Sequence, residues 1–194
     1  MLNRNSIVLY VAIFIISLGL SSCSYREENL NPKHIGLDAK FKGYDSLENM
    51  EIDSSLIVKA VKVDEDEPTI VMADGLMVSC YTISNLEISK VYKDNTTEYT
   101  SKDTIRILEN EAYNKYDNTI YHVAGYEKMK LGDEYLLFLR KSNTDDWYIP
   151  VGIVFGKVDL GDDKAARYLN AHEQEIIDYS VIDQINEDAR AKYQ

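Results

Sequence analysis

The chain has 194 residues and a formal net charge of −12, from 33 acidic and 21 basic residues. This length is enough for one domain with its own hydrophobic core. The acidic balance argues against nucleic acid as a partner, because an acidic surface repels phosphate polymers. It also repels anionic lipid and anionic cell-wall polymers, and its simplest consequence is solubility.

The N-terminus contains the one long apolar run of the chain. Residues 7–20 are predominantly apolar, a length of 14 that suits a secretory signal and falls short of the ~20 residues of a membrane-spanning helix. The run ends in Leu20-Ser21-Ser22-Cys23. This arrangement resembles the bacterial lipoprotein signal, in which small residues precede an obligatory cysteine. An uncleaved N-terminal anchor and an ordinary signal peptide are the alternatives.

The resemblance implies that residues 1–22 form a signal peptide and that Cys23 becomes a diacylglyceryl cysteine. Acyl chains such as palmitate then hold the mature protein on the extracytoplasmic face of the cell membrane, since two chains anchor a protein stably where one is marginal. Loss of residues 1–22 removes Arg4 and no acidic residue, so the mature chain has 20 basic and 33 acidic residues and a net charge of −13.

The other cysteine is Cys80, which has no disulfide partner if Cys23 carries lipid. It lies in the β-type run 77–83. We therefore expect Cys80 to be a small buried hydrophobic residue rather than a nucleophile.

Residues 23–43 are polar and mixed in charge, which predicts a tether between the lipid and the folded domain. A short helix is predicted over residues 44–53. Asp45 is its expected N-cap, with Glu48 three residues later at capping-box spacing. The apolar side of this helix is formed by Leu47, Met50 and Ile52.

Strands are predicted at residues 55–63, 69–73, 76–92, 104–108, 120–124, 131–139 and 147–158. The first has apolar residues on both faces at its start, as a buried barrel strand does. Asp74-Gly75 predicts a hairpin between the second and third. The alternation of the third breaks near Ser84 and Asn85, which predicts a β-bulge there.

The connecting segments are polar. The acidic run 64–67 has no EF-hand spacing and is followed by Pro68, so a solvated loop is favoured over a calcium site. Residues 93–102 are predicted as a loop, and residues 109–119 have no clear period. The segment 147–158 is predicted to be an edge strand with bends, because it contains Pro150, Gly152 and Gly156.

From residue 161 to residue 194 the pattern is helical, with apolar residues at a spacing of three to four. This predicts a C-terminal helical segment packed on the barrel. Whether it forms one helix or two, with a break near Tyr179 and Ser180, is left open.

The strand order predicts a mainly β fold in which residues 44–160 form a small OB-fold-like Greek-key barrel. Residues 55–158 are similar to the OB-fold-like domains of exported bacterial lipoproteins, and distantly to the netrin/TIMP-like module. Residues 131–139 and 148–158 carry most of this resemblance. The pattern consists of strands and contains no catalytic signature.

No catalytic, cofactor or metal site is predicted. His34, His122 and His172 are far apart in the sequence, and the chain has no phosphate-binding glycine loop, nucleophile elbow or metal-spaced cysteine pair. The candidate partner-binding residues are aromatic side chains in or beside predicted loops, and core filling explains them equally well. They are Tyr121, Tyr126, Trp147 and Tyr148.

The sequence therefore favours a lipid-anchored, non-enzymatic surface protein that binds an exported protein or a cell-wall component. The alternatives are a TIMP-like protease inhibitor and an enzyme with an unrecognised site. In TIMP-like inhibitors a free N-terminal cysteine chelates the protease zinc. Lipidation of Cys23 and its distance from the barrel argue against that mechanism.

Overall fold

The computed structural model describes residues 31–161 and 179–193. All but the first of these residues belong to one compact unit, Pro32–Gln194. The predicted signal, Cys23, the beginning of the tether, and residues 162–178 of the predicted C-terminal segment lie outside the described residues. No helix of the described part is both long and apolar enough to span a bilayer.

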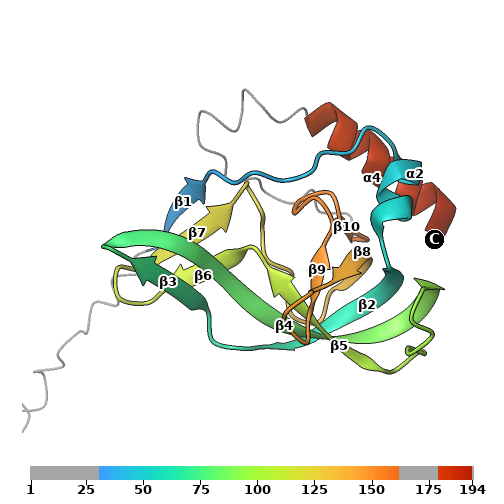
Figure 1. The fold of residues 1–194 in the computed structure, drawn as a ribbon, viewed down its shortest axis with the longest axis horizontal. Coiled ribbons are helices and arrows are strands. Elements are labelled where there is room, and N and C mark those ends of the chain that lie inside the picture. The colour runs from blue at the N-terminus through green and yellow to red at the C-terminus, as the bar shows by residue number, and fades with distance from the viewer. Residues whose placement is uncertain (1–30, 162–178, 194) are drawn as a thin grey trace, which may run out of the picture. The chain divides into compact units, whose positions relative to one another are not determined.

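Five strands close into a barrel, which confirms the predicted fold class. They are β2 (Leu56–Glu65), β4 (Leu76–Asp94), β5 (Thr104–Glu109), β8 (Glu134–Lys141) and β9 (Tyr148–Pro150). The order is β8-β2-β4-β5-β9, and β9 closes the barrel by pairing in parallel with β5 and antiparallel with β8. A further strand, β10 (Lys157–Asp159), pairs with β8. The protein is mainly β, with an OB-fold-like barrel (Figure 1).

β2 and β8 are apolar on both faces because each separates two cores. Leu56, Val58 and Ala60 of β2 point into the barrel, where they meet Leu137 and Leu139 of β8. The alternate residues pack in a second cluster outside the barrel, beneath two helices. These residues include Ile57, Leu136 and Phe138. The two-sided apolar pattern predicted for the first strand is therefore confirmed.

The predicted hairpin is present, formed by β3 (Thr69–Ala73) and the beginning of β4, with Asp74 and Gly75 both at positive φ in the turn. The predicted bulge in β4 is wrong. β4 pairs with β5 without a register shift from Thr82 to Glu87, and the nearby irregularity with β2 adds a residue to β2, at Val63. The apparent break arises because inward positions of β4 carry the polar residues Thr82 and Ser84, both buried.

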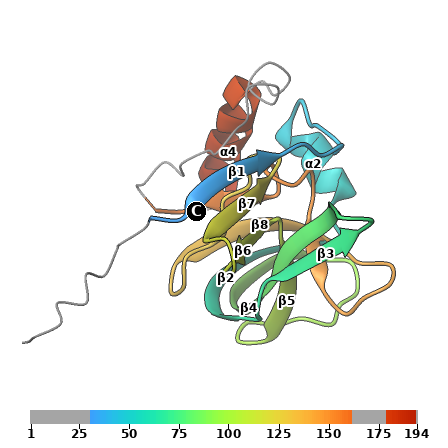
Figure 2. The same cartoon turned by 90° about the vertical axis from the view of Figure 1, so that its left-hand side faces the viewer.

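A second, three-stranded sheet lies beside the β3–β4 hairpin (Figure 2). It contains β1 (Lys33–Leu37), β7 (Thr119–Val123) and β6 (Glu111–Asn114), in the order β1-β7-β6. β7 was predicted. β6 was not predicted. The predicted tether, residues 23–43, is wrong over residues 33–37, because these residues form β1 and pair in parallel with β7. Both strands are short and polar, and their pairing partners are distant in sequence.

Two helices cover the second core. α2 (Leu47–Asp53) is the predicted short helix, but its N-cap is Ser46, whose hydroxyl accepts from the Asn49 amide, and not Asp45. Met50 is buried as expected, whereas Ile52 is 67% exposed and does not belong to the apolar side. α4 (Tyr179–Tyr193) confirms a C-terminal helix. It buries Ile182, Ile185 and Ala189 in the second core.

The predicted edge strand 147–158 is two short strands, β9 and β10, joined by a turn. Gly152 in this turn has a positive φ. At Gly156 the chain passes close to the backbone of Val151 and Phe138. A Cβ at this position would lie 2.5 Å from Val151 N and 2.6 Å from Phe138 O. These glycines bring the turn against the centre of β8.

Candidate functional site

A cleft of about 520 Å³ opens where the end of β2, the small sheet and the segment between β7 and β8 meet. Its size lies within the range of small-ligand sites. Its lining mixes carboxylates, histidines, lysines and a few apolar side chains. The lining residues are His34, Asp64, Glu65, Glu111, Ile120, His122, Glu127, Lys128, Met129, Lys130 and Leu131.

Beneath the cleft lies a buried ion pair between Lys62 of β2 and Glu109 of β5. Lys62 Nζ donates to Glu109 Oε1 at 2.8 Å and to the Met129 carbonyl at 2.9 Å. It also reaches Glu65 Oε2, at 2.6 Å. Lys62 is 1% exposed and Glu109 is 0% exposed. An ammonium group in such a place needs several acceptors, and Lys62 has three.

Glu109 in turn accepts from several groups around it. Its Oε2 accepts from the Met129 amide at 2.6 Å and from the Tyr126 hydroxyl at 3.2 Å. Its Oε1 also accepts from the Ser84 hydroxyl. The carboxylate therefore ties the 126–129 segment, which lines the cleft, to the wall of the barrel. Burial, and then the nearby Glu109 charge, raise the pKa of Tyr126 well above its usual value.

Glu65 connects this buried pair to the cleft surface. It bonds Lys62 on one side, and its Oε1 accepts from Lys128 Nζ at 2.7 Å on the other. Burial alone would raise the pKa of Glu65, but hydrogen bonds from Lys128 and Lys62 hold it below the usual value. This carboxylate therefore stays ionised and is occupied by two lysines.

The cleft also contains a histidine pair that no pattern in the sequence predicts. His34 of β1 and His122 of β7 stack with ring centroids 5.1 Å apart, and His34 Nδ1 lies 2.8 Å from His122 Nε2. His122 Nδ1 lies 2.9 Å from the Tyr126 carbonyl, which only accepts, so this nitrogen carries a proton. In the neutral ring Nε2 then accepts from His34. Burial, and then the adjacent His122, lower the pKa of His34.

Glu111 and Glu127 supply the acidic side of the cleft. Glu111 Oε2 lies 3.1 Å from His122 Nδ1 and accepts from the Lys128 amide at 2.9 Å. Glu127 differs, because its Oε2 is buried and has no hydrogen-bond partner among the described residues. Burial raises the pKa of Glu127, an effect that the charge of Lys157 opposes. Glu127 is thus a polar group of the cleft that the fold does not itself satisfy.

Several polar groups of the cleft are already engaged within the protein. Both ring nitrogens of His122 are engaged within the protein, and Lys62 and Glu65 are paired. The residues lining the cleft include no serine, threonine or cysteine that could act as a nucleophile. Among the lining residues, Glu127 has an unsatisfied oxygen and Leu131 is largely exposed.

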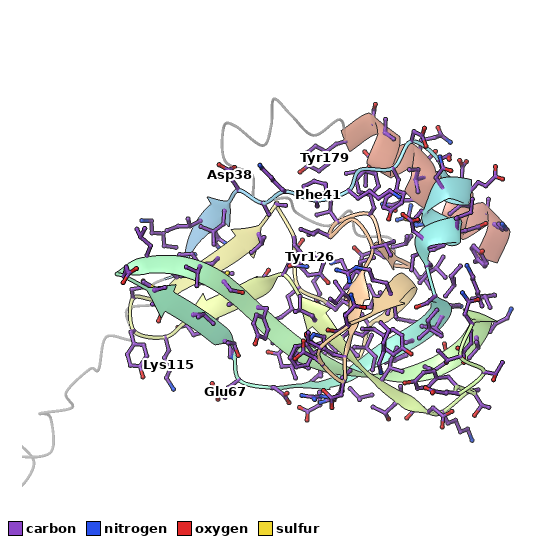
Figure 3. All side chains as sticks on the ribbon, viewed as in Figure 1. Asp38, Phe41, Glu67, Lys115, Tyr126 and Tyr179 are labelled. Atoms are coloured by element: carbon purple, nitrogen blue, oxygen red, sulfur yellow. The ribbon has the colours of Figure 1, made fainter. Side chains whose placement is uncertain are left out.

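The four predicted partner-binding aromatics are not brought together in the cleft. Tyr126 and Tyr148 are core residues, 1% and 2% exposed, so their prediction as partner contacts is wrong (Figure 3 labels Tyr126). Tyr121 and Trp147 are partly exposed. Tyr121 donates to Asp117 Oδ2 at 3.1 Å, and the Trp147 ring lies 6.1 Å from that of Tyr81.

Cys80 is buried and is the free cysteine of the described part. Burial, with a smaller effect of the Glu111 charge, raises its pKa to about 11. This thiol is therefore protonated and poorly reactive, in agreement with the structural role predicted for it. Within residues 31–161 and 179–193, we find no group of three or more histidine, cysteine or acidic side chains that could hold a metal ion.

The positions that sequence reasoning missed are His34, His122, Lys62 and Glu109. The histidines meet only because β1 adds to β7, and no local pattern marks that pairing. Lys62 and Glu109 could have been found, because Lys62 shares its strand face with Leu56, Val58 and Ala60. A lysine and a glutamate at inward positions of two strands suggest a buried pair.

Comparison with known proteins adds no assignment. The sequence matches no family model, and no curated protein matches it.

Proposed function

We propose that the chain is a lipid-anchored protein of the bacterial cell envelope whose barrel is a non-enzymatic binding module. Cys23 is the lipid attachment point, and the cleft beside the His34–His122 pair is the binding site. The partner is an exported protein or a cell-envelope component, and Leu131 lies at the rim where the partner makes contact.

One observation carries the proposal: the cleft has a rigid polar floor and an unsatisfied polar wall. The floor is held by the Lys62–Glu109 pair and its hydrogen bonds, so it is already in its binding shape. The wall contains Glu127 Oε2, whose burial without a partner is unfavourable until a ligand donates to it. At the entrance, Leu131 is 67% exposed, so a ligand that enters the cleft can reach its side chain.

Site-specific photocrosslinking on intact cells tests the proposal. A photoreactive amino acid replaces Leu131 in the full-length protein, and a matched variant carries it at Ile52, a residue on α2 with the same 67% exposure. We expect one dominant adduct from position 131 that is absent from position 52. The identity of the adduct, read by mass spectrometry, distinguishes a protein from an envelope polymer.

The same experiment is repeated with Glu127→Gln, which keeps the shape of the side chain and removes its charge. A weaker adduct at position 131 is expected. Equal adduct patterns at positions 131 and 52, or no adduct at position 131, would contradict the assignment of the cleft as a binding site.

A further inference from the structure

The β3–β4 hairpin leaves the barrel as a two-stranded ribbon. β3 pairs with β4 alone, and residues 76–81 of β4 pair with β3 before β4 joins β5 at Thr82. Several apolar side chains of this ribbon are exposed, because no other strand of the sheet covers them. We define the apolar tip as Val71, Met72, Leu76 and Val78 of the ribbon together with Tyr116 of the β6–β7 turn; Leu76 is 71% exposed and Tyr116 is 90% exposed.

The apolar tip is almost uncharged in an otherwise acidic protein. Residues 69–80 contain one ionisable acidic or basic side chain, Asp74, while charged residues make up 28% of the chain. The neighbouring β6–β7 turn adds Lys115 and Asp117, whose charges oppose each other. A surface of this kind loses little by leaving water and does not repel anionic lipid, unlike the rest of the molecule.

The apolar tip lies at the end of the domain where the described chain begins. β3 and β4 both lie against β6, which leads into the turn that carries Tyr116. The Lys33 amide, at the start of β1, donates to the Asn118 carbonyl of the same turn at 2.9 Å. Figure 1 shows the β3–β4 hairpin and the start of β1 at its left-hand end, and Figure 3 places Lys115 there also.

The length of chain before β1 limits how far this end can lie from a membrane. Lys33 lies ten positions after Cys23, and a fully extended chain spans at most about 3.3–3.6 Å per residue, or roughly 35 Å in all. A lipid on Cys23 therefore keeps the apolar tip close to the bilayer, at a high effective concentration.

We propose that the apolar tip docks on the membrane, with the ribbon entering the lipid headgroup region beside the anchor. This inference rests on the proposed lipidation of Cys23. The tip residues enter to the ~5–10 Å depth typical of interfacial segments, with the Asp74 carboxylate among the headgroups. The docked ribbon fixes the orientation of the barrel relative to the membrane.

Depth-dependent quenching in vesicles tests this docking. The lipidated full-length protein is reconstituted in phosphatidylethanolamine–phosphatidylglycerol vesicles with an environment-sensitive fluorophore on a single introduced cysteine, in a Cys80→Ala background. The label is placed at Leu76→Cys. The control label is at Ile52→Cys, an apolar position of similar exposure (67% against 71%) on α2, at the other end of the domain (Figure 1). Nitroxide-labelled lipids serve as quenchers.

We expect the label at position 76 to show blue-shifted emission and a loss of intensity with nitroxide lipids, and the label at position 52 to show neither. Replacing Met72 and Val78 by serine should reduce the shift at position 76. If the protein floats with the vesicles but positions 76 and 52 behave alike, the docking is wrong and the anchor stands. If the protein does not float with the vesicles, the anchor itself is wrong.

A second copy of the chain is the competing occupant of the apolar tip. In that case the shift at position 76 grows with protein density in the vesicles, and unlabelled Leu76→Cys protein forms disulfide-linked dimers when an oxidant such as copper–phenanthroline is added. This result would overturn the docking on lipid.

Discussion

Lys62 is the residue on which the polar interior of the barrel depends. Its ammonium group is buried and neutralised by Glu109 and Glu65, with the Met129 carbonyl as a further acceptor. Removal of one member of a buried pair is costly because the other charge remains in a place that water does not reach. The same contacts hold the floor of the cleft, so stability and binding depend on one network.

Lys62→Met should therefore lower the free energy of unfolding by about 3–5 kcal/mol, measured by urea denaturation. The control is Lys59→Met on the same strand, whose ion pair with Glu134 is partly exposed, with an expected loss of about 0–1 kcal/mol. The double variant Lys62→Met/Glu109→Gln removes the leftover charge and keeps a side-chain oxygen that can accept from Met129 and Tyr126, so it should recover part of the loss. A loss no larger for Lys62→Met than for Lys59→Met would refute the role given to the buried pair.

Cys80 is expected to make the free energy of unfolding depend on pH. Its pKa is raised from 9.0 to about 11 in the folded protein, because burial disfavours the thiolate. Above pH 9 the unfolded chain loses this proton while the folded protein retains it, so the free energy of unfolding should fall as the pH rises from about 9 to about 11. Several buried tyrosines titrate in the same region, and the comparison with Cys80→Ala isolates the thiol.

The fall in unfolding free energy between pH 9 and pH 11 should be smaller in Cys80→Ala by about 2 kcal/mol. In the same pH range the folded wild-type thiol should react slowly with a soluble disulfide reagent, and rapidly only in denaturant. Parallel stability curves for the two proteins would show that the thiol makes no such contribution.

At the scale of elements, the turn between β9 and β10 closes the barrel against β8. Phe138 lies at the centre of this contact, since its amide donates to the Gly156 carbonyl at 2.8 Å and its carbonyl accepts from the Val151 amide at 3.0 Å. The surrounding atoms are backbone and cannot move aside as the end of a flexible side chain does. Position 156 therefore requires glycine because a side chain would clash with backbone atoms, and not because of its φ angle.

Gly156→Ala should destabilise the protein by about 1–3 kcal/mol or more, because the added methyl group overlaps the backbone of β8 and of the turn. Thermal or urea unfolding measures the effect. Gly43→Ala is the matched control, since a Cβ at Gly43 meets nothing within 4 Å. Equal stability of the two variants would mean that the turn does not press against β8 as described.

At the scale of the whole molecule, charge is distributed unevenly. The domain is strongly acidic, yet residues 69–80 of the ribbon carry a single charged side chain, Asp74. Anionic lipid repels an acidic body more than a nearly uncharged ribbon, so an anchor at Cys23, as proposed, would favour an orientation with the ribbon toward the membrane. The proposed anchor and the proposed docking surface thus favour the same orientation of the domain at the membrane.

Cys23→Ala should abolish lipid attachment and signal cleavage, so the protein should accumulate as an uncleaved precursor or be released from the membrane. Immunoblotting of membrane and soluble fractions measures both size and location. Ser22→Ala is the control, because it keeps a small residue before the cysteine and should be processed normally. A mature-sized, membrane-retained Cys23→Ala protein would disprove the lipidation proposal.

Much of the barrel follows from local sequence. The two-sided apolar pattern of β2, the Asp74-Gly75 turn and the apolar strand β8 are short-range signals, and each is read from neighbouring residues. The N-cap was placed one residue early, at Asp45 instead of Ser46, because both residues are good caps and geometry selects between them.

The site was far less predictable. Tyr126 and Tyr148 lie near loops in the sequence yet are buried, because burial depends on which elements pack over a loop. β1 and β6 lack apolar periodicity, and their pairing with β7 creates the wall that brings His34 to His122. The interaction between these residues joins positions 88 apart in the chain.

The sequence by itself determined most of the barrel strands, the turn chemistry of the β3–β4 hairpin, the buried thiol and the C-terminal helix, because each depends on the period or composition of adjacent residues. Only the tertiary structure decided the closure of the barrel by β9, the histidine pair, the cleft and the exposure of the β3–β4 ribbon. These features depend on contacts between residues distant in the chain, which are selected by the packing of the whole domain rather than by any local preference.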